Sequence, residues 1–168
     1  LEFRRVLFRS NPTRRADDKA AHRLGLIKAI ERKPYRFDTQ GVGVANGLWI
    51  FRPDLAVAGW QDLFEKVENV AVDAAGAAAV ASPDKPAELT WRVYTPYTIT
   101  GAFLEGELTI PEGGSIAAAV SADSGATWKE LGPLKAGPLR LGLREQVADG
   151  FGYLVRLTMQ GRGAAVGG

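Results

Sequence analysis

The stretch FGYLVRLTMQ, residues 151–160, alternates apolar and polar side chains almost without a break. One face would carry Phe151, Tyr153, Val155, Leu157 and Met159, and the other Arg156, Thr158 and Gln160. Leu154 is the single interruption. A period of two residues is typical of a β-strand with one buried and one solvated face. The end of the chain therefore predicts a half-buried strand.

Seven further apolar or alternating runs come before it, at residues 69–73, 77–81, 88–94, 97–110, 115–121, 127–131 and 139–143. In the third of these runs, Leu89, Trp91 and Val93 would face inward, with Thr90, Arg92 and Tyr94 outward. Gly, Pro, Asp and Ser separate the runs, and no long helical pattern lies between them. The sequence therefore predicts a mainly β fold, a two-sheet antiparallel β-sandwich of jelly-roll or immunoglobulin-like type.

The N-terminal third of the chain has a different texture. In residues 15–32, apolar side chains recur at three- and four-residue steps, which predicts an amphipathic helix that Pro34 ends. Residues 48–51 predict a short strand closed by Pro53, and residues 60–67 one or two helical turns. We therefore expect a leader helix and linker at 11–47, a β-sandwich module at 48–162 and a Gly-rich tail at 163–168.

The first ten residues, LEFRRVLFRS, match the translation of a widely used short-read sequencing adaptor at every position. This resemblance implies that residues 1–10 are an adaptor artefact, that they pack without specificity or are poorly ordered, and that the chain begins inside a longer protein. The whole chain has 21 basic and 19 acidic residues. Residues 11–168 have 18 of each, because the first ten hold three arginines and one glutamate. Much of the basic pI would then be artefactual.

Several classes of chemistry are disfavoured by composition. The chain has no cysteine, which excludes disulfides, thiolate metal sites and cysteine nucleophiles. Its one histidine, His22, lies on the predicted helix, where we expect it at the surface. Asp17 with Asp18, and Glu105 with Glu107, lack the spacing of a calcium loop. We therefore predict no catalytic residues, no metal and no cofactor.

Charge and hydropathy bear on the partners. Residues 14–36 hold eight basic and three acidic residues, a pattern compatible with a nucleic-acid tether or with a solvated helix face. The helical spacing of the charges favours the second interpretation, so we predict no nucleic-acid partner. No apolar run approaches the roughly 20 residues that a bilayer-spanning helix needs, so we predict no membrane span.

The most specific motif is SADSGATW, residues 121–128. Asp123 can accept hydrogen bonds from turn amides, Gly125 can adopt a positive φ, and Trp128 can fold over a hairpin across which Ser121 and Thr127 pair. These residues resemble the Asp box, S-x-D-x-G-x-T-W, of sialidase-like and BNR-repeat proteins. The resemblance implies a structural role, remote from catalysis. A single copy favours a sandwich over a repeating propeller.

A wider resemblance covers residues 48–160. It rests on WIFRPDL (49–55), ENV (68–70), LTWRVYTPYTITGA (89–102), the Asp box and GYLVRL (152–157), which are similar to accessory modules of large exported bacterial proteins. It implies a non-catalytic module of a periplasmic, cell-surface or secreted protein, with a structural or a glycan- or protein-binding role. Its partners would be other domains of the same parent chain and a glycan.

Two further hypotheses concern particular residues. Phe51, Arg52 and Pro53 resemble the F-R-I-P motif of sialidases but lack its isoleucine, so a fragment of a sialidase-like glycoside hydrolase is the alternative function. Arg92, Tyr94 and Tyr97 form a candidate ligand platform on which aromatic rings would stack against a sugar. The competing interpretation is that both tyrosines pack at the end of the sandwich with their hydroxyls bound to backbone.

Overall fold

The computed structural model describes residues 8–9, 33–35, 44–46, 50–95 and 97–167, with side chains from residue 50 onward. The helix predicted at 15–32, with His22, Asp17 and Asp18, lies outside the described residues. Of the first ten residues, the structure describes Phe8–Arg9 as a two-residue strand, β1, that pairs with β8 (Thr98–Ile99). A second short pair joins β2 (Lys33–Tyr35) to β3 (Val44–Asn46).

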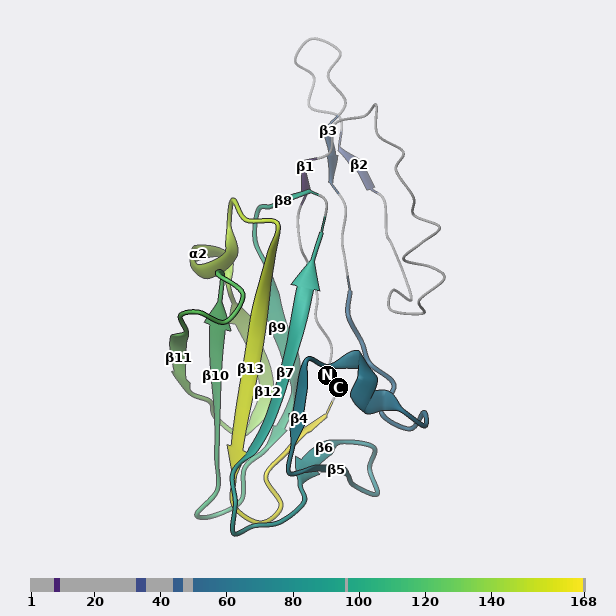
Figure 1. Cartoon of the computed structure of the whole chain (residues 1–168), viewed down its shortest axis with the longest axis vertical. Coiled ribbons are helices and arrows are strands. Elements are labelled where there is room, and N and C mark those ends of the chain that lie inside the picture. Colours follow the sequence, from purple (N-terminus) through teal and green to yellow (C-terminus); the bar gives the residue numbers. More distant parts are fainter. Residues whose placement is uncertain (1–7, 10–32, 36–43, 47–49, 96, 168) are drawn as a thin grey trace.

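Two five-stranded antiparallel sheets form the body of the described chain (Figure 1). The first has the order β11 (Lys129–Pro133), β10 (Ser115–Ser121), β13 (Gly152–Gln160), β7 (Ala87–Tyr94) and β4 (Lys66–Glu68). The second has the order β12 (Gly137–Gly142), β9 (Phe103–Thr109), β14 (Ala165–Gly167), β6 (Ala78–Val80) and β5 (Val70–Val72). This confirms the prediction of a mainly β, two-sheet antiparallel sandwich.

A single apolar core joins the two sheets. Leu89 and Trp91 of β7 and Leu104 of β9 are fully buried in it. On β13, the alternation observed in the sequence places four side chains in the same core: Tyr153, Val155, Leu157 and Met159. Phe151 does not join them, contrary to the prediction, because β13 begins only at Gly152 and the ring of Phe151 is 55% exposed.

The chain changes sheets at Asn69, between β4 and β5. This residue adopts the left-handed conformation, with φ 53°. Its side-chain amide donates to the carbonyl oxygens of Ser82 and Lys85, both at 2.8 Å, and its Oδ1 accepts from the Ser82 N–H at 2.9 Å. One side chain thus satisfies backbone groups of the loop that carries the chain from β6 to β7, at the point where the two sheets diverge.

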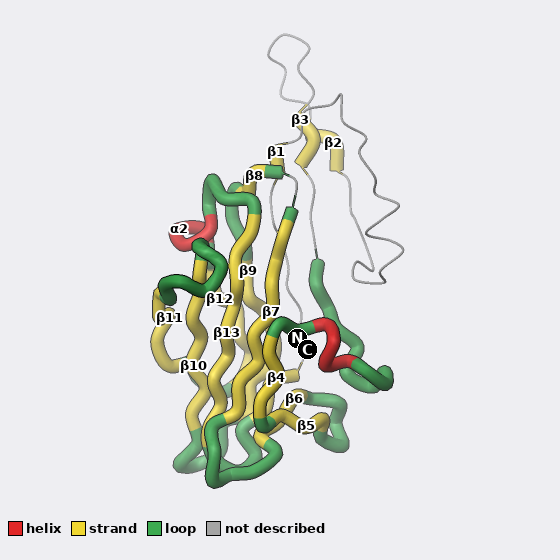
Figure 2. Tube along the Cα trace, viewed as in Figure 1, coloured by secondary structure: helices red, strands yellow, loops and turns green. Residues whose placement is uncertain are grey.

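Three elements differ from the sequence expectation. Residues 60–67 form only a short 3-10 helix, η1 (Trp60–Leu63), and then enter β4, so the helical turn ends earlier than predicted. The tail expected at 163–168 contains β14, which pairs with both β9 and β6 and is buried, so the module extends to Gly167. A one-turn helix, α2 (Arg144–Val147), follows β12. Both helical elements are small beside the sheets (Figure 2).

An aromatic cluster attaches the segment before β4 to the sandwich. The ring of Phe64 makes edge-to-face contacts with Phe51, Trp60 and the core Trp91, with ring centroids 6.0, 5.7 and 6.3 Å away. Edge-to-face geometry is favourable for aromatic pairs at these separations. Residues 51–64 therefore belong to the same packed unit as the two sheets.

Candidate functional site

The SADSGATW motif forms the turn between β10 and β11, which we call the Asp123 turn (residues 121–128). Asp123 Oδ1 accepts from the Thr127 N–H at 2.9 Å and from the Ser121 hydroxyl at 2.7 Å. Its Oδ2 accepts from the Thr127 hydroxyl at 2.6 Å. Ser121 Oγ in turn accepts from the Gly125 N–H at 2.8 Å. The carboxylate thus lies between Ser121 and Thr127 and joins the two ends of the turn.

These hydrogen bonds stabilise the ionised carboxylate. The Thr127 hydroxyl, then the Thr127 N–H and the Ser121 hydroxyl, lower the pKa of Asp123 from 3.8 to about 2. Gly125 has φ 93°, a conformation that favours glycine, and Ser124 has φ 59°. The polar groups of Ser121, Asp123 and Thr127 are engaged in holding the turn.

Trp128 lies on the outer face of the first sheet and is half-buried. The guanidinium of Arg156 stacks over its ring, 4.3 Å from the centroid, and donates to Glu130 Oε1 at 3.0 Å. Ala119 stands between Arg156 and Glu130 in the strand register, and its small side chain lets the arginine lie across β10. The indole therefore packs against Arg156 in addition to the Asp123 turn.

Leu154 faces outward on β13 but is only 6% exposed. A Cβ added at Gly125 would come within 3.4 Å of its Cδ1 and 3.9 Å of the Trp128 ring. The Asp123 turn thus folds over Leu154. This explains the one break in the alternation of residues 151–160: Leu154 is apolar although it lies on the outward face, because the Asp123 turn covers it.

Two of the three predicted platform residues share the outer face of β7. Arg92 donates from Nε to Glu65 Oε1 at 2.8 Å and from Nη1 to the Ser124 hydroxyl at 3.4 Å. Tyr94 is 72% exposed and pairs in register with Gly152 of β13. A Cβ at Gly152 would approach the Tyr94 ring to 3.3 Å, so the absence of a side chain there leaves room for the ring beside the strand.

Tyr97 is placed elsewhere. It is half-buried and packs against the core, on the connection to β8. The structure instead brings Phe151 to this end of the sheet, where its carbonyl accepts from the Thr95 N–H at 2.8 Å. Phe151, Ser124 and Arg156 are the neighbours that sequence reasoning missed. Arg156 lies diagonal to Arg92 in the register of β13 against β7, Ser124 accepts a hydrogen bond from Arg92, and Phe151 directly precedes Gly152, the register partner of Tyr94. The sequence alone does not give these relations.

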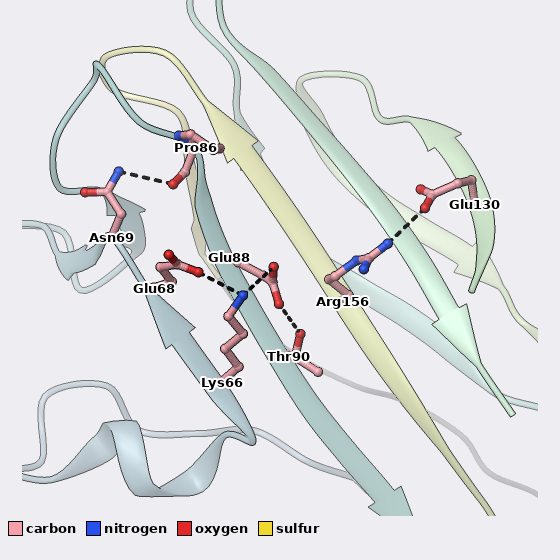
Figure 3. A network of polar contacts seen from close by, with 8 residues as sticks. All are labelled: Lys66, Glu68, Asn69, Pro86, Glu88, Thr90, Glu130 and Arg156. Atoms are coloured by element: carbon pink, nitrogen blue, oxygen red, sulfur yellow. Dashed lines mark hydrogen bonds and ion pairs between the residues drawn. The ribbon is translucent and has the colours of Figure 1, made fainter. Parts of the chain in front are cut away.

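The rest of this outer surface is a network of ion pairs (Figure 3). Lys66 Nζ contacts Glu68 Oε2 at 2.8 Å and Glu88 Oε2 at 3.0 Å, and Glu88 Oε1 accepts from Thr90 at 3.0 Å. Hydrogen bonds to Glu68 and Glu88 raise the pKa of Lys66, and the bond to Lys66 lowers the pKa of Glu68. We call the outward surface of the first sheet, including the Asp123 turn, the polar face.

The other candidate residues are not part of this face. Arg52 is exposed in the segment before η1, next to the ring cluster of Phe51 and Phe64. Glu105 pairs with Arg140 at 3.3 Å on the second sheet. Within the described ranges, no group of three or more histidine, aspartate or glutamate residues is arranged to hold a metal ion.

No helix in the part of the chain that the structure describes has the length and apolar character of a membrane-spanning segment. No family model and no curated protein matches this sequence. The assignment of function therefore depends on the geometry of the polar face.

Proposed function

We propose that this chain is a non-catalytic β-sandwich accessory module that binds glycan through the end of its polar face. The observation that carries the proposal is Tyr94, which is 72% exposed on a regular strand and stands two residues from an outward arginine, Arg92. An exposed tyrosine on a rigid sheet offers a flat apolar ring at low cost in conformational entropy. Phe151, also exposed, adds a second ring at the same end of the sheet.

The chemistry of this arrangement suits a sugar. A pyranose has apolar C–H patches that stack on aromatic rings and hydroxyls that need hydrogen-bond partners. Arg92 supplies N–H donors whose direction is fixed by Glu65 at 2.8 Å. The spacing between Tyr94 and Arg92 along β7 is about 7 Å, since residues i and i+2 of a strand share a face. A single sugar unit can therefore contact both.

The remaining features support the accessory role. The Asp123 turn uses its polar groups internally, as expected of a structural Asp box. The strand order also supports the jelly-roll type of sandwich. Among the strands of the two five-stranded sheets, every connection between successive strands except β5–β6 and β10–β11 crosses from one sheet to the other. We further propose that the parent protein is exported and that the module positions its neighbouring domains.

The direct test is affinity electrophoresis of the purified chain in gels that contain soluble polysaccharides. We expect retardation in at least one gel and a loss of about tenfold in affinity for Tyr94→Ala, because the stacking ring is removed. Val57→Ala is the matched control, since Val57 is also an exposed apolar residue but lies outside the polar face. Equal retardation of Tyr94→Ala and the parent would contradict the proposed site.

A second assay addresses the sialidase alternative. The chain is incubated with a fluorogenic sialoside, and we expect no release of the fluorophore above the buffer rate. Turnover that Arg52→Ala abolishes would overturn the accessory role and identify the chain as part of a glycoside hydrolase.

A further inference from the structure

We infer that the ligand is a neutral glycan chain that continues from Tyr94 and Arg92 to Arg156. This inference rests on the proposed function and deepens it by naming the class of ligand and a second contact residue. It is carried by three properties of the polar face: the strand register, the fixation of Arg156 and the balance of charge.

The register places the two arginines beside each other. Arg92 pairs with Leu154, and Thr90 pairs with Arg156, so Arg92 and Arg156 occupy diagonal outward positions on β7 and β13. Diagonal neighbours in an antiparallel pair lie about 7–8 Å apart. Tyr94 stands one outward position beyond Arg92. The ring and the two guanidinium groups thus follow one line across the face, over the covered side chain of Leu154.

Arg156 is held in place before any ligand arrives. Trp128 supports one face of its guanidinium at 4.3 Å, and Glu130 accepts one of its five N–H groups at 3.0 Å. The other donors of Arg156 have no hydrogen-bond partner among the described residues. A side chain fixed by stacking and by one ion pair loses little further entropy on binding, so its remaining donors suit sugar hydroxyls.

The balance of charge decides between ligand classes. The outward charged residues are three cations (Lys66, Arg92 and Arg156) and four carboxylates (Glu65, Glu68, Glu88 and Glu130), and each cation is paired with at least one carboxylate. With the ionised Asp123 of the turn, the polar face therefore has a net charge of −2. The net negative charge of the face would repel a polyanion, because no basic patch is left uncompensated to attract it. A neutral glycan uses the same donors without that penalty.

The experiment compares neutral polysaccharides (a β-glucan, a xylan and a mannan) with acidic ones (a pectate, an alginate and hyaluronan) by affinity electrophoresis and calorimetry, at low and high salt. We expect binding to a neutral polymer that changes little with salt. Arg156→Gln should weaken it about fivefold to tenfold, the loss of a charge-assisted hydrogen bond. Gln160→Ala is the matched control, because Gln160 is an exposed outward residue further along β13.

A second variant reverses the preference by charge alone. Glu65→Gln combined with Glu130→Gln brings the net charge of the polar face from −2 to 0 and removes the carboxylate partners of Arg92 and Arg156. We therefore expect new, salt-sensitive retention on the acidic polymers. Thermal unfolding of each variant confirms that it is folded.

The outcomes separate the inference from the proposed function. Binding of the parent chain to acidic polymers only would overturn the neutral ligand and leave the glycan-binding function intact. Neutral binding that Arg156→Gln does not weaken would overturn the second contact. No binding to any polymer would overturn both the inference and the proposed function.

Discussion

Asp123 makes the stability of this protein depend on acidity. Its pKa is about 2 in the folded chain, against 3.8 for a free side chain, because Thr127 and Ser121 donate hydrogen bonds to the ionised form. A carboxyl whose pKa is lower in the folded state stabilises that state above the unfolded pKa. The contribution is therefore complete above about pH 4, declines between pH 4 and 2, and is absent below pH 2.

We expect Asp123→Asn to lower the melting temperature at pH 7 and to flatten its decrease between pH 4 and 2. The measurement is a series of thermal unfolding curves from pH 7 to 2 for the variant and the parent. Thr127→Val is the conservative control, because it removes only the hydroxyl that contacts Asp123 Oδ2, and it should shift the acid transition upward. Parallel curves for Asp123→Asn and the parent would disprove the role of the carboxylate.

Asn69 is the second residue on which the fold depends. Only Asn, Asp and Gly adopt its φ of 53° readily. Of these three, only Asn has a side-chain amide, which donates hydrogen bonds to the carbonyls of Ser82 and Lys85 and accepts one from the Ser82 N–H. We expect Asn69→Ala to cost about 2–3 kcal/mol in urea unfolding, since it removes several hydrogen bonds and leaves backbone groups unsatisfied.

Asn69→Gly separates the two causes, because glycine tolerates the backbone conformation but supplies no amide. Asn69→Gly should lower the free energy of unfolding less than Asn69→Ala does, and the difference is the backbone strain of a non-glycine residue at this φ. If Asn69→Ala unfolded at the same urea concentration as the parent, the residue would not organise the crossing between sheets.

At the scale of elements, the sequence predicts strands that have one buried apolar face and one solvent-exposed polar face. It fails to predict strands that lack this alternation. The run at 115–121 corresponds to β10, and the alternation of 88–94 and 151–160 corresponds to β7 and β13 within a residue. β4 is only three residues long and follows a helical pattern, so the sequence pattern predicts helical turns there. β14, Ala-Val-Gly, is buried between two neighbouring strands and shows no alternation.

The candidate site was predictable to the same extent. Alternation along one strand places Arg92 and Tyr94 on a common outward face, and this needs no knowledge of other strands. Arg156 joins them only through the register of β13 against β7, and Phe151 comes near them because it directly precedes Gly152, the partner of Tyr94. Tyr97 is expected beside them because it flanks the corner after Tyr94, but β7 ends at Tyr94 and Tyr97 packs against the core on the connection to β8.

The position of β14 leads to a prediction about the end of the chain. This strand lies between β9 and β6, and Ala164, Ala165 and Val166 are at most 4% exposed. Ending the chain after Arg162 would expose the edges of both neighbouring strands and open the core. We expect the shortened protein to lose its cooperative urea transition and its near-ultraviolet dichroism.

Val166→Ala is the graded control, because it keeps the strand and removes only buried methyl groups. It should destabilise the protein by about 2 kcal/mol while the transition stays cooperative. A shortened chain that unfolds like the parent would show that β14 is dispensable, as expected of a tail.

At the scale of the molecule, the two sheets and residues 51–64 share one hydrophobic cluster, so we expect them to unfold as one unit. Phe64 connects residues 51–64 to the core of the sandwich, because its ring contacts Phe51, Trp60 and the fully buried Trp91. Phe64→Ala should lower stability by about 2–3 kcal/mol, somewhat less than a fully buried phenylalanine, since Phe64 is only half-buried.

The effect of Phe64→Ala on the cooperativity of unfolding is a more specific test than its loss of stability. In the parent, tryptophan fluorescence and far-ultraviolet dichroism should give coincident urea transitions. In Phe64→Ala, the fluorescence transition should come first, because Trp60 loses its edge-to-face partner and residues 51–63 detach while the strands persist. Phe64→Leu keeps most of the buried volume and should retain coincident transitions at reduced stability. Coincidence in Phe64→Ala would mean that the segment is held by contacts other than this ring, and that the aromatic cluster does not couple it to the sandwich.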